Sequence, residues 1–441
     1  MTLAALWPHT PAERAALAAL LLAYLLLAAA FAALTPAWQN PDEPAHYNYA
    51  AQVARAGCCP VIEPGDWDSA YLDELKAARF APERLAQLDT IQYEDHQPPL
   101  YYLLAAPVHQ ISGGSLLALR LFSALLGAGV VICAYLTARA MLPERLAVAL
   151  GAAALVAFLP QHLAMMASAN NDALAGLLIG VGLLLAVLHV KGARVPAWAL
   201  GLAAGLIFIT KASGYPTAAV LLLALVLRHR RGALPHMAAF LIPALGLGAL
   251  WWLRNLGVYG FPDFLGLAAH DRVVIGQPRT ADAVAAVGLG QHLLSGLQTT
   301  FNSFWGQFGW MALPLPGWMY RLFQAAIAAG LVGLAAGRFA LPRSQPPPGQ
   351  RQAWLLLGLT LALALLAFVY YNTEFVQFQG RYLYPALIPF ALLLALGVDN
   401  LGRWLLPHFA PARWLAPALF ALLAPLNAYL LVFVIRPLLA P

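Results

Sequence analysis

The chain has 441 residues, of which 61% are hydrophobic and only 10% are charged, and its mean hydropathy is +0.71. Because soluble proteins carry about 25% charged residues, this composition excludes a soluble protein and indicates an integral membrane protein. The formal net charge of +6 does not indicate nucleic-acid binding, since most basic residues lie in short turns between apolar stretches.

Apolar stretches of about 20 residues recur along the chain, which predicts membrane-spanning helices rather than the alternating strands of a barrel. We predict an all-α fold, a polytopic transmembrane helix bundle of about 11 spans, as a single domain over residues 1–441. The predicted spans lie at about 14–35, 115–140, 146–163, 172–190, 196–210, 215–228, 237–255, 318–337, 353–371, 383–398 and 414–435.

The turns rich in Lys and Arg set the predicted orientation. With a cytoplasmic N-terminus, every such turn falls on the cytoplasmic side: 139–145, 191–194, 228–231, 338–351 and 403–413. The two long loops, 36–97 and 256–316, then lie outside, where we expect them to form the cap of an active site. High Ala, Leu, Arg and Pro content is typical of a bacterium with a GC-rich genome. The predicted location is therefore the bacterial cytoplasmic (inner) membrane, with the site facing the periplasm.

The first long loop contains three helix-like pieces, at about 42–56, 69–79 and 82–88, which we expect to lie on the membrane face as amphipathic helices. Ser69 is the predicted N-cap of the second piece, and an apolar helix at about 98–110 follows the loop. Cys58 and Cys59 are adjacent in this loop, which disfavours a disulfide between them.

Two carboxylates and one imidazole directly follow the first span. Asp42 and Glu43 are adjacent, and His46 lies one helical turn further on. Acids at a membrane boundary of so apolar a chain are candidates for function. The alternative is a helix start with Asn40 as N-cap and Pro41 at the first helical position. That alternative explains one acid better than the pair with His46, and it is compatible with a functional site.

Three cations occupy the outer ends of predicted spans, where the positive-inside rule does not expect them: Lys211, Arg254 and Arg381. Snorkelling to lipid headgroups could explain each alone. Together, beside polar or Gly/Pro-broken sequence, they favour one anionic ligand such as a phosphate or pyrophosphate. Acids share these outer ends, so we expect an external cavity with a carboxylate wall and a cationic wall; they are Asp42, Glu43, Glu94, Asp95 and Asp172.

One reaction class uses both walls: sugar transfer from a lipid-linked phosphate donor. A carboxylate removes the proton of an acceptor hydroxyl, and the cations stabilise the negative charge that develops on the departing phosphate. The isoprenoid tail of the donor would lie in the bilayer beside the spans.

Several motifs, in this order, resemble the GT-C glycosyltransferase superfamily, and most closely its protein O-mannosyltransferase and lipid A aminoarabinose transferase branch. They are the acidic pair after the first span, Gln-Pro-Pro-Leu-Tyr-Tyr at 97–102, Asn-Asn-Asp-Ala-Leu at 170–174, Thr-Lys-Ala-Ser-Gly at 210–214, Trp-Leu-Arg-Asn at 252–255 with Tyr-Gly-Phe-Pro at 259–262, and Gly-Arg-Tyr-Leu-Tyr-Pro at 380–385. No single motif is specific, and the resemblance rests on their order and common side over roughly 14–400.

The resemblance implies an inverting transferase with Asp42 as catalytic base, Glu43 beside it and Asp172 near the reacting centre. It implies that Lys211 and Arg254 bind the donor phosphate, and that Arg381 and Tyr382 match a later Arg-Tyr motif. Polar side chains near these motifs complete the predicted substrate pocket: His46, His96, Gln97, Asn171 and Asn255.

A divalent metal cation is the only cofactor that the sequence suggests. Asp42 and His46 would share a helical face, and with His96 they could hold the ion. Hydrogen bonding of the histidines to the acids is the favoured alternative, because this spacing is not a metal-ligand signature.

The predicted partners are a polyprenyl-phosphate-linked sugar, a glycan, lipid or protein acceptor, and membrane lipids. The main alternative is a transporter or flippase of a lipid-linked glycan, and a binding or assembly protein without turnover is the third. Transporters usually carry inverted repeats with polar groups at the membrane midplane. Here no repeat is evident and the charges lie at the outer ends, which favours the transferase.

Overall fold

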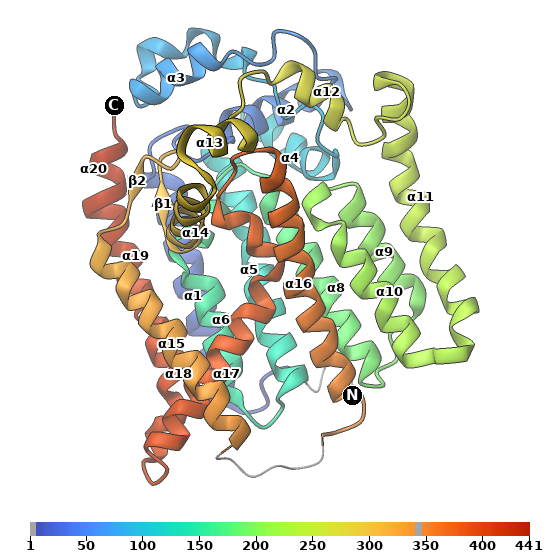
Figure 1. Cartoon of the computed structure of the whole chain (residues 1–441), viewed down its shortest axis with the longest axis vertical. Helices are drawn as coiled ribbons and strands as arrows, with labels where there is room; N and C mark the ends of the chain where they lie inside the picture. Colours follow the sequence, from blue (N-terminus) through green and yellow to red (C-terminus); the bar gives the residue numbers. More distant parts are fainter. Residues whose placement is uncertain (1–5, 340–345) are drawn as a thin grey trace.

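The computed structural model describes residues 6–339 and 346–441, and these residues are almost wholly helical (Figure 1). Long helices run roughly alongside one another as a bundle, and shorter helices close one end. The predicted all-α, polytopic membrane fold is confirmed. The described residues also include two short antiparallel strands, β1 (Gln307–Phe308) and β2 (Leu313–Pro314).

The bundle combines long helices with short helical segments at their ends. Its α-helices are α1 (Pro11–Leu34), α5 (Leu116–Met141), α6 (Leu146–Phe158), α7 (Pro160–Met166), α8 (Asp172–Val190), α9 (Ala197–Phe208), α10 (Pro216–His229), α11 (Ala233–Tyr259), α15 (Gly317–Phe339), α16 (Gln350–Glu374), α17 (Leu387–Leu405), α18 (Leu415–Ala421), α19 (Leu423–Leu430) and α20 (Arg436–Leu439). The short segments are η3 (Ala212–Gly214), η4 (Arg230–Gly232), η5 (Gly380–Ala386), η6 (Ala410–Trp414) and the π-helical η7 (Leu431–Ile435).

The predicted count of about 11 spans is not confirmed. Eight helical stretches of the described residues are long and apolar enough to cross a membrane, or nine if the bent pair α6–α7 is one span. One difference is α9, which has only 12 residues. The other is Ala212–Tyr259, a single 48-residue stretch by that criterion, which folds back at η4 into α10 and α11 (Figure 1).

A break between α6 and α7 turns the chain by 64° inside the bundle. Pro160 begins α7 and has no N–H to donate to the carbonyl of Val156, four residues earlier. The Nδ1 of His162 donates to that carbonyl instead, at 2.7 Å. The His162 side chain therefore satisfies the Val156 carbonyl that the break leaves free, and this hydrogen bond fixes the orientation of the His162 ring.

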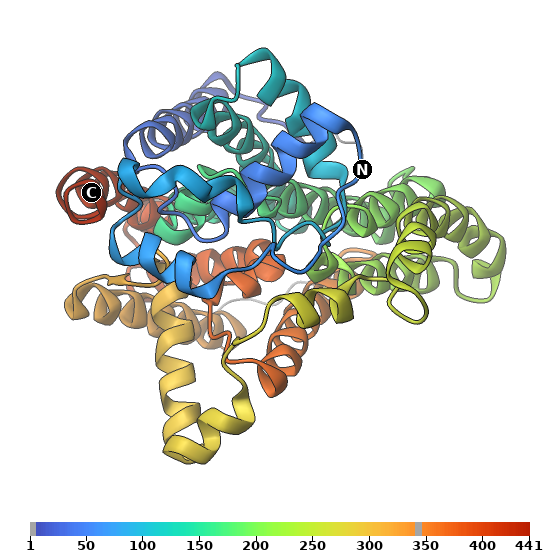
Figure 2. The ribbon, with the colours of Figure 1, turned by 90° about the horizontal axis from the view of Figure 1, so that it is seen from above.

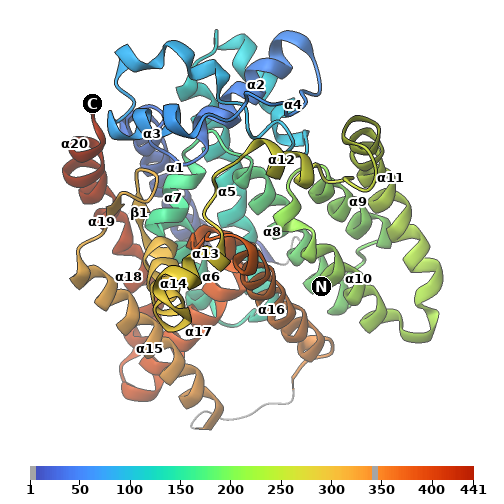
Figure 3. The same ribbon diagram turned by 45° about the horizontal axis from the view of Figure 1, so that its top comes forward.

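The two long loops form the cap at one end of the bundle (Figures 2 and 3). The first loop carries α2 (Glu43–Ala56), α3 (Ser69–Ala77) and η2 (Pro82–Thr90), close to the three predicted pieces, and α4 (Leu100–Ile111) follows it. The second loop carries α12 (Leu267–Val273), α13 (Thr280–Val287) and α14 (Leu289–Trp305). A buried cluster joins the loops, with Trp38, Leu75 and Tyr93 packed in one core with Ala269 and Val274.

Three local details differ from the sequence prediction. The N-cap of α2 is Asp42, in a left-handed conformation with φ of 66°, rather than Asn40. The N-cap of α3 is Asp68, which accepts from the N–H of Tyr71, rather than Ser69. Cys58 and Cys59 are joined by a disulfide.

Candidate functional site

A continuous chain of ion pairs lies where the cap meets the bundle. Arg381 binds Asp42 through Nη2, and its Nη1 lies 3.9 Å from Asp172 Oδ2. Lys211 binds the other oxygen of Asp172 at 2.6 Å. Four of the predicted residues, drawn from four distant parts of the sequence, therefore meet. The carboxylates and cations alternate, however, whereas we predicted two separate charged walls.

Each member of this chain sits at the end of a helical element. Asp42 caps α2, Asp172 is the first residue of α8, Lys211 directly precedes η3 and Arg381 is in the first turn of η5. A carboxylate at a helix N-terminus is favoured by the helix dipole. These positions fix the polar side chains at the ends of rigid elements while the apolar helix bodies pack in the membrane.

Hydrogen bonds extend the ion pairs to His46. Lys211 donates to Asn171 Oδ1 at 2.7 Å, and Asn171 Nδ2 donates to the hydroxyl of Tyr102 at 3.3 Å. That hydroxyl lies 2.7 Å from Nδ1 of His46. The predicted pocket residues Asn171 and His46 are thereby joined to the site, and Tyr102 is a link that our sequence analysis did not single out.

Three side chains at this site form a potential metal-binding group. Asp42, His46 and Glu94 each present one ligand atom within 4.8 Å of the others. The Oε2 atom of Glu94 is buried and has no hydrogen-bond partner among the described residues. The set differs from the predicted one in a single member, because Glu94 stands where we expected His96. The His96 ring packs instead against His270 of α12, with centroids 4.3 Å apart.

The cap acids differ strongly in their proton affinity. Burial acts to raise the pKa of Asp42, but the charge and hydrogen bond of Arg381 lower it to about 2. Burial raises the pKa of Asp95 to about 8, opposed mainly by its hydrogen bond from Gln52. Burial also lowers the pKa of His46. Near pH 7 the site therefore combines an ionised Asp42 with a neutral His46, and Asp95 is largely protonated.

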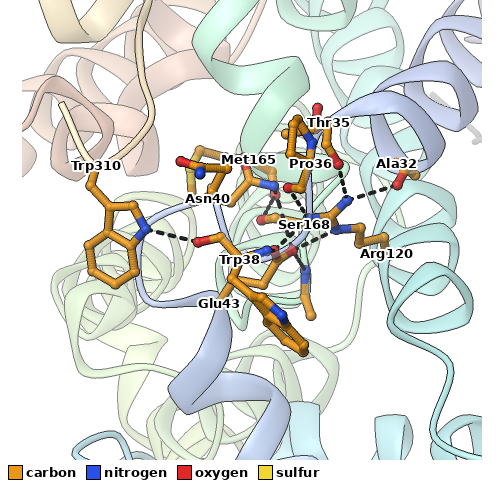
Figure 4. A network of polar contacts seen from close by, with 12 residues as sticks. Ala32, Thr35, Pro36, Trp38, Asn40, Glu43, Arg120, Met165, Ser168 and Trp310 are labelled. Atoms are coloured by element: carbon orange, nitrogen blue, oxygen red, sulfur yellow. Dashed lines mark hydrogen bonds and ion pairs between the residues drawn. The ribbon is translucent and has the colours of Figure 1, made fainter. Parts of the chain in front are cut away.

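Glu43, predicted as a second catalytic acid, lies in a closed structural network (Figure 4). Its side chain is fully buried and binds Arg120 of α5 through both oxygens, at 2.8 and 2.6 Å. It also accepts from the backbone N–H groups of Trp38 and Ala169 and from the amide of Asn40. These five donors bind both oxygens of the carboxylate, so Glu43 is already hydrogen-bonded on both sides.

Arg120 ties this network to the end of the first span. It donates to the carbonyls of Ala32, Thr35 and Pro36, at 2.7–3.1 Å. Our sequence analysis missed Arg120, although a charged residue inside an apolar span was a usable signal.

The second predicted phosphate ligand, Arg254, makes its contacts elsewhere. Its guanidinium donates to the carbonyls of Cys59 and Pro60 and to Asn255 Oδ1. Asn255 donates in turn to the carbonyl of Phe264. These two predicted residues join the first cap loop to the second.

The remaining predicted pocket residues lie at the edges of the site. Gln97 contacts His96, and its carbonyl accepts from Tyr49. The guanidinium carbon of Arg381 lies over the ring of Tyr382, 5.3 Å from the ring centroid.

A small cavity of about 40 Å³ adjoins the ion pairs. Asp172, Arg381 and Tyr382 form part of its wall, together with His162 and apolar residues of α5, α8 and α17. His162 is a second polar residue that our sequence analysis missed. Its position within an apolar span was again the available signal.

Comparison with known proteins identifies one family model and several solved structures. The family model, described as "Predicted membrane protein (DUF2142)", matches residues 76–390. No curated protein matches the chain. ArnT from Cupriavidus metallidurans, solved bound to undecaprenyl phosphate, is similar in structure with a TM-score of 0.49 and 16% identity, covering 96% of this chain and 73% of that one.

Two structures of the Archaeoglobus fulgidus oligosaccharyltransferase are also similar, each with a TM-score of 0.48. The apo form is 14% identical and covers 96% of this chain. The complex of AglB with an inhibitory peptide and a dolichol-phosphate is 13% identical and covers 94%. This chain spans 55% of the length of each.

Proposed function

The chain belongs to the DUF2142 family of predicted membrane proteins, and we propose that it is an inverting glycosyltransferase. It would move a hexose or pentose from a polyprenyl-phosphate donor to a glycan, lipid or protein of the cell envelope, at the periplasmic face of the bacterial cytoplasmic membrane. One observation carries the proposal: a partly buried, ionised Asp42 shares Arg381 with Asp172, which also binds Lys211. These residues would supply a base and two phosphate-binding cations at one end of a membrane bundle.

In the proposed reaction, the donor phosphate binds Arg381 and Lys211, and the acceptor hydroxyl lies against Asp42. Asp42 takes the hydroxyl proton while the acceptor oxygen attacks the anomeric carbon from the face opposite the phosphate. The bond from that carbon to the phosphate oxygen breaks, and polyprenyl phosphate leaves with the electron pair. The cations stabilise the added negative charge.

The resting ion pair between Asp42 and Arg381 gives the donor a second role. A carboxyl whose pKa is about 2 is a weak base at neutral pH, since an effective base has a pKa near the working pH. A donor phosphate competes for the guanidinium and brings negative charge close to Asp42, and both effects raise the pKa of Asp42. Donor binding would therefore activate the base.

We assign Glu43 a positioning role, because five donors already hold its carboxylate. It would fix the peptide that carries Asp42. We assign Arg254 to joining the cap loops, since it binds backbone carbonyls of the first loop.

A divalent cation fits the group of Asp42, His46 and Glu94, because the buried Glu94 Oε2 has no hydrogen-bond partner among the described residues. Carboxylate and imidazole ligands suit several such ions. When bound, the cation would add positive charge beside the departing phosphate.

The test is turnover by the purified protein in lipid nanodiscs with a panel of polyprenyl-phosphate hexoses and pentoses, measured as released polyprenyl phosphate. Wild type should turn over at least one donor. Asp42→Asn should lower that rate by about 10²–10⁴-fold, the usual contribution of a general base. Asp73→Asn is the matched control, because Asp73 is an exposed acid of the same loop. An Asp42→Asn variant with the wild-type rate would remove Asp42 as the base.

A further inference from the structure

The cavity beside the ion pairs is lined by a buried histidine that the proposed reaction does not use. His162 lines its wall together with Asp172, Arg381 and Tyr382. The His162 side chain is only 2% exposed. At about 40 Å³, the cavity has room for a few water molecules or for one functional group of a larger ligand.

The break at Pro160 determines which nitrogen of His162 faces a ligand. Nδ1 lies 2.7 Å from the carbonyl of Val156. A carbonyl only accepts hydrogen bonds, so Nδ1 carries the proton and donates it. In the neutral ring, Nε2 is then an acceptor with a free lone pair. The main-chain break therefore fixes both the orientation and the tautomer of this imidazole.

The cavity offers both an unused acceptor and an unused donor. The Nε2 of His162 has no hydrogen-bond partner within residues 6–339 and 346–441. Arg381 Nη1 is buried and also makes no hydrogen bond within these ranges. A buried donor such as Arg381 Nη1 is nearly always hydrogen-bonded. A ligand with an anionic oxygen for Arg381 and a nearby hydroxyl for His162 would satisfy both.

We propose that His162 accepts a hydrogen bond from a hydroxyl of the donor sugar while Arg381 binds the adjoining phosphate. His162 is then a specificity residue that distinguishes a sugar-bearing polyprenyl phosphate from the bare lipid phosphate that remains after transfer. This inference rests on the proposed function, and it adds a contact made by the sugar rather than by the phosphate. The contact favours release of the product, which lacks that hydroxyl.

The test compares the binding of two kinds of probe to the full-length protein in nanodiscs: farnesyl phosphate, and farnesyl phosphate carrying glucose, mannose or arabinose. His162→Leu should weaken the best sugar-bearing probe by about 3- to 10-fold, the effect of one neutral hydrogen bond. Binding of farnesyl phosphate should not change. His189→Leu is the matched control, because His189 is equally buried and donates through Nδ1 to the carbonyl of Val195. It should leave both affinities unchanged.

Loss of the Nδ1 donor could also disturb the break, so His162→Gln provides a second variant whose amide can donate and accept. It should retain more of the sugar-dependent affinity than His162→Leu. Equal losses for both kinds of probe, or no loss for either, would overturn the role of His162 alone. Wild type that binds no probe would contradict the proposed function as well.

Discussion

Loss of one partner from the buried ion pair between Glu43 and Arg120 should strongly destabilise the protein. Arg120→Met removes the guanidinium but leaves the Glu43 carboxylate fully buried. In the folded protein the side chain of Glu43 is 0% exposed and that of Arg120 is 3% exposed. An uncompensated buried charge of this kind costs about 3–5 kcal/mol. For a chain of 441 residues, a loss of that size lowers the Tm by about 3–5 °C.

The measurement is thermal unfolding of the detergent-solubilised protein by intrinsic tryptophan fluorescence. Glu43→Gln combined with Arg120→Met should recover part of the loss, because the neutral amide leaves no buried charge. Its single oxygen can still accept from the N–H of Trp38 or from that of Ala169, which bind different oxygens of Glu43. The reasoning is refuted if Arg120→Met unfolds within about 1 °C of wild type, or if the double variant loses the full sum of the two single effects.

Two further results follow from the charges of the site. The pKa of Asp95 is raised to about 8, so its protonated form is favoured in the folded protein, and stability should fall by about 1.4 kcal/mol per pH unit between its unfolded pKa and pH 8. Asp95→Asn should abolish this dependence and unfold at a higher temperature than wild type at pH 7.5 but not at pH 4; a Tm difference independent of pH would contradict it. Lys211→Met should raise the apparent donor KM by about 10- to 100-fold through a lost charge-assisted bond, while Arg254→Ala should lower the Tm with little effect on KM. An unchanged KM in Lys211→Met together with a raised KM in Arg254→Ala would indicate that Arg254, rather than Lys211, binds the phosphate.

The sequence predicted the elements of the cap better than their contacts. The pieces at 42–56, 69–79 and 82–88 correspond closely to α2, α3 and η2, because local apolar patterns and capping residues determine such helices. Asp42, Asp172, Lys211 and Arg381 were selected as candidates because each interrupts apolar sequence at a helix end. Their side chains meet in the fold, and their roles stay a prediction.

The partners of these residues could not be predicted, because they come from distant segments. Arg120 lies 77 residues from Glu43, and no local pattern pairs them. The expectation of separate acidic and cationic walls also failed for a physical reason. Opposite charges in a buried site attract strongly, so they alternate when the chain can bring them together.

The predicted count of about 11 spans is not confirmed, and the short helix α9 is one reason. The stretch at 196–210 reads as a span, but α9 has 12 residues and is too short to cross a bilayer core of about 30 Å unaided. Composition identifies apolar segments, whereas their length as continuous helices depends on how the neighbouring chain turns.

A lipid phosphate should bind the cations that now hold Asp42 and Asp172. A structure of the protein with bound farnesyl phosphate tests this directly. We expect phosphate oxygens within hydrogen-bonding distance of Arg381 and Lys211, and an Asp42 carboxylate released from Arg381. A phosphate bound at the opposite end of the bundle, or an intact pair between Asp42 and Arg381 with the lipid phosphate bound elsewhere, would contradict it.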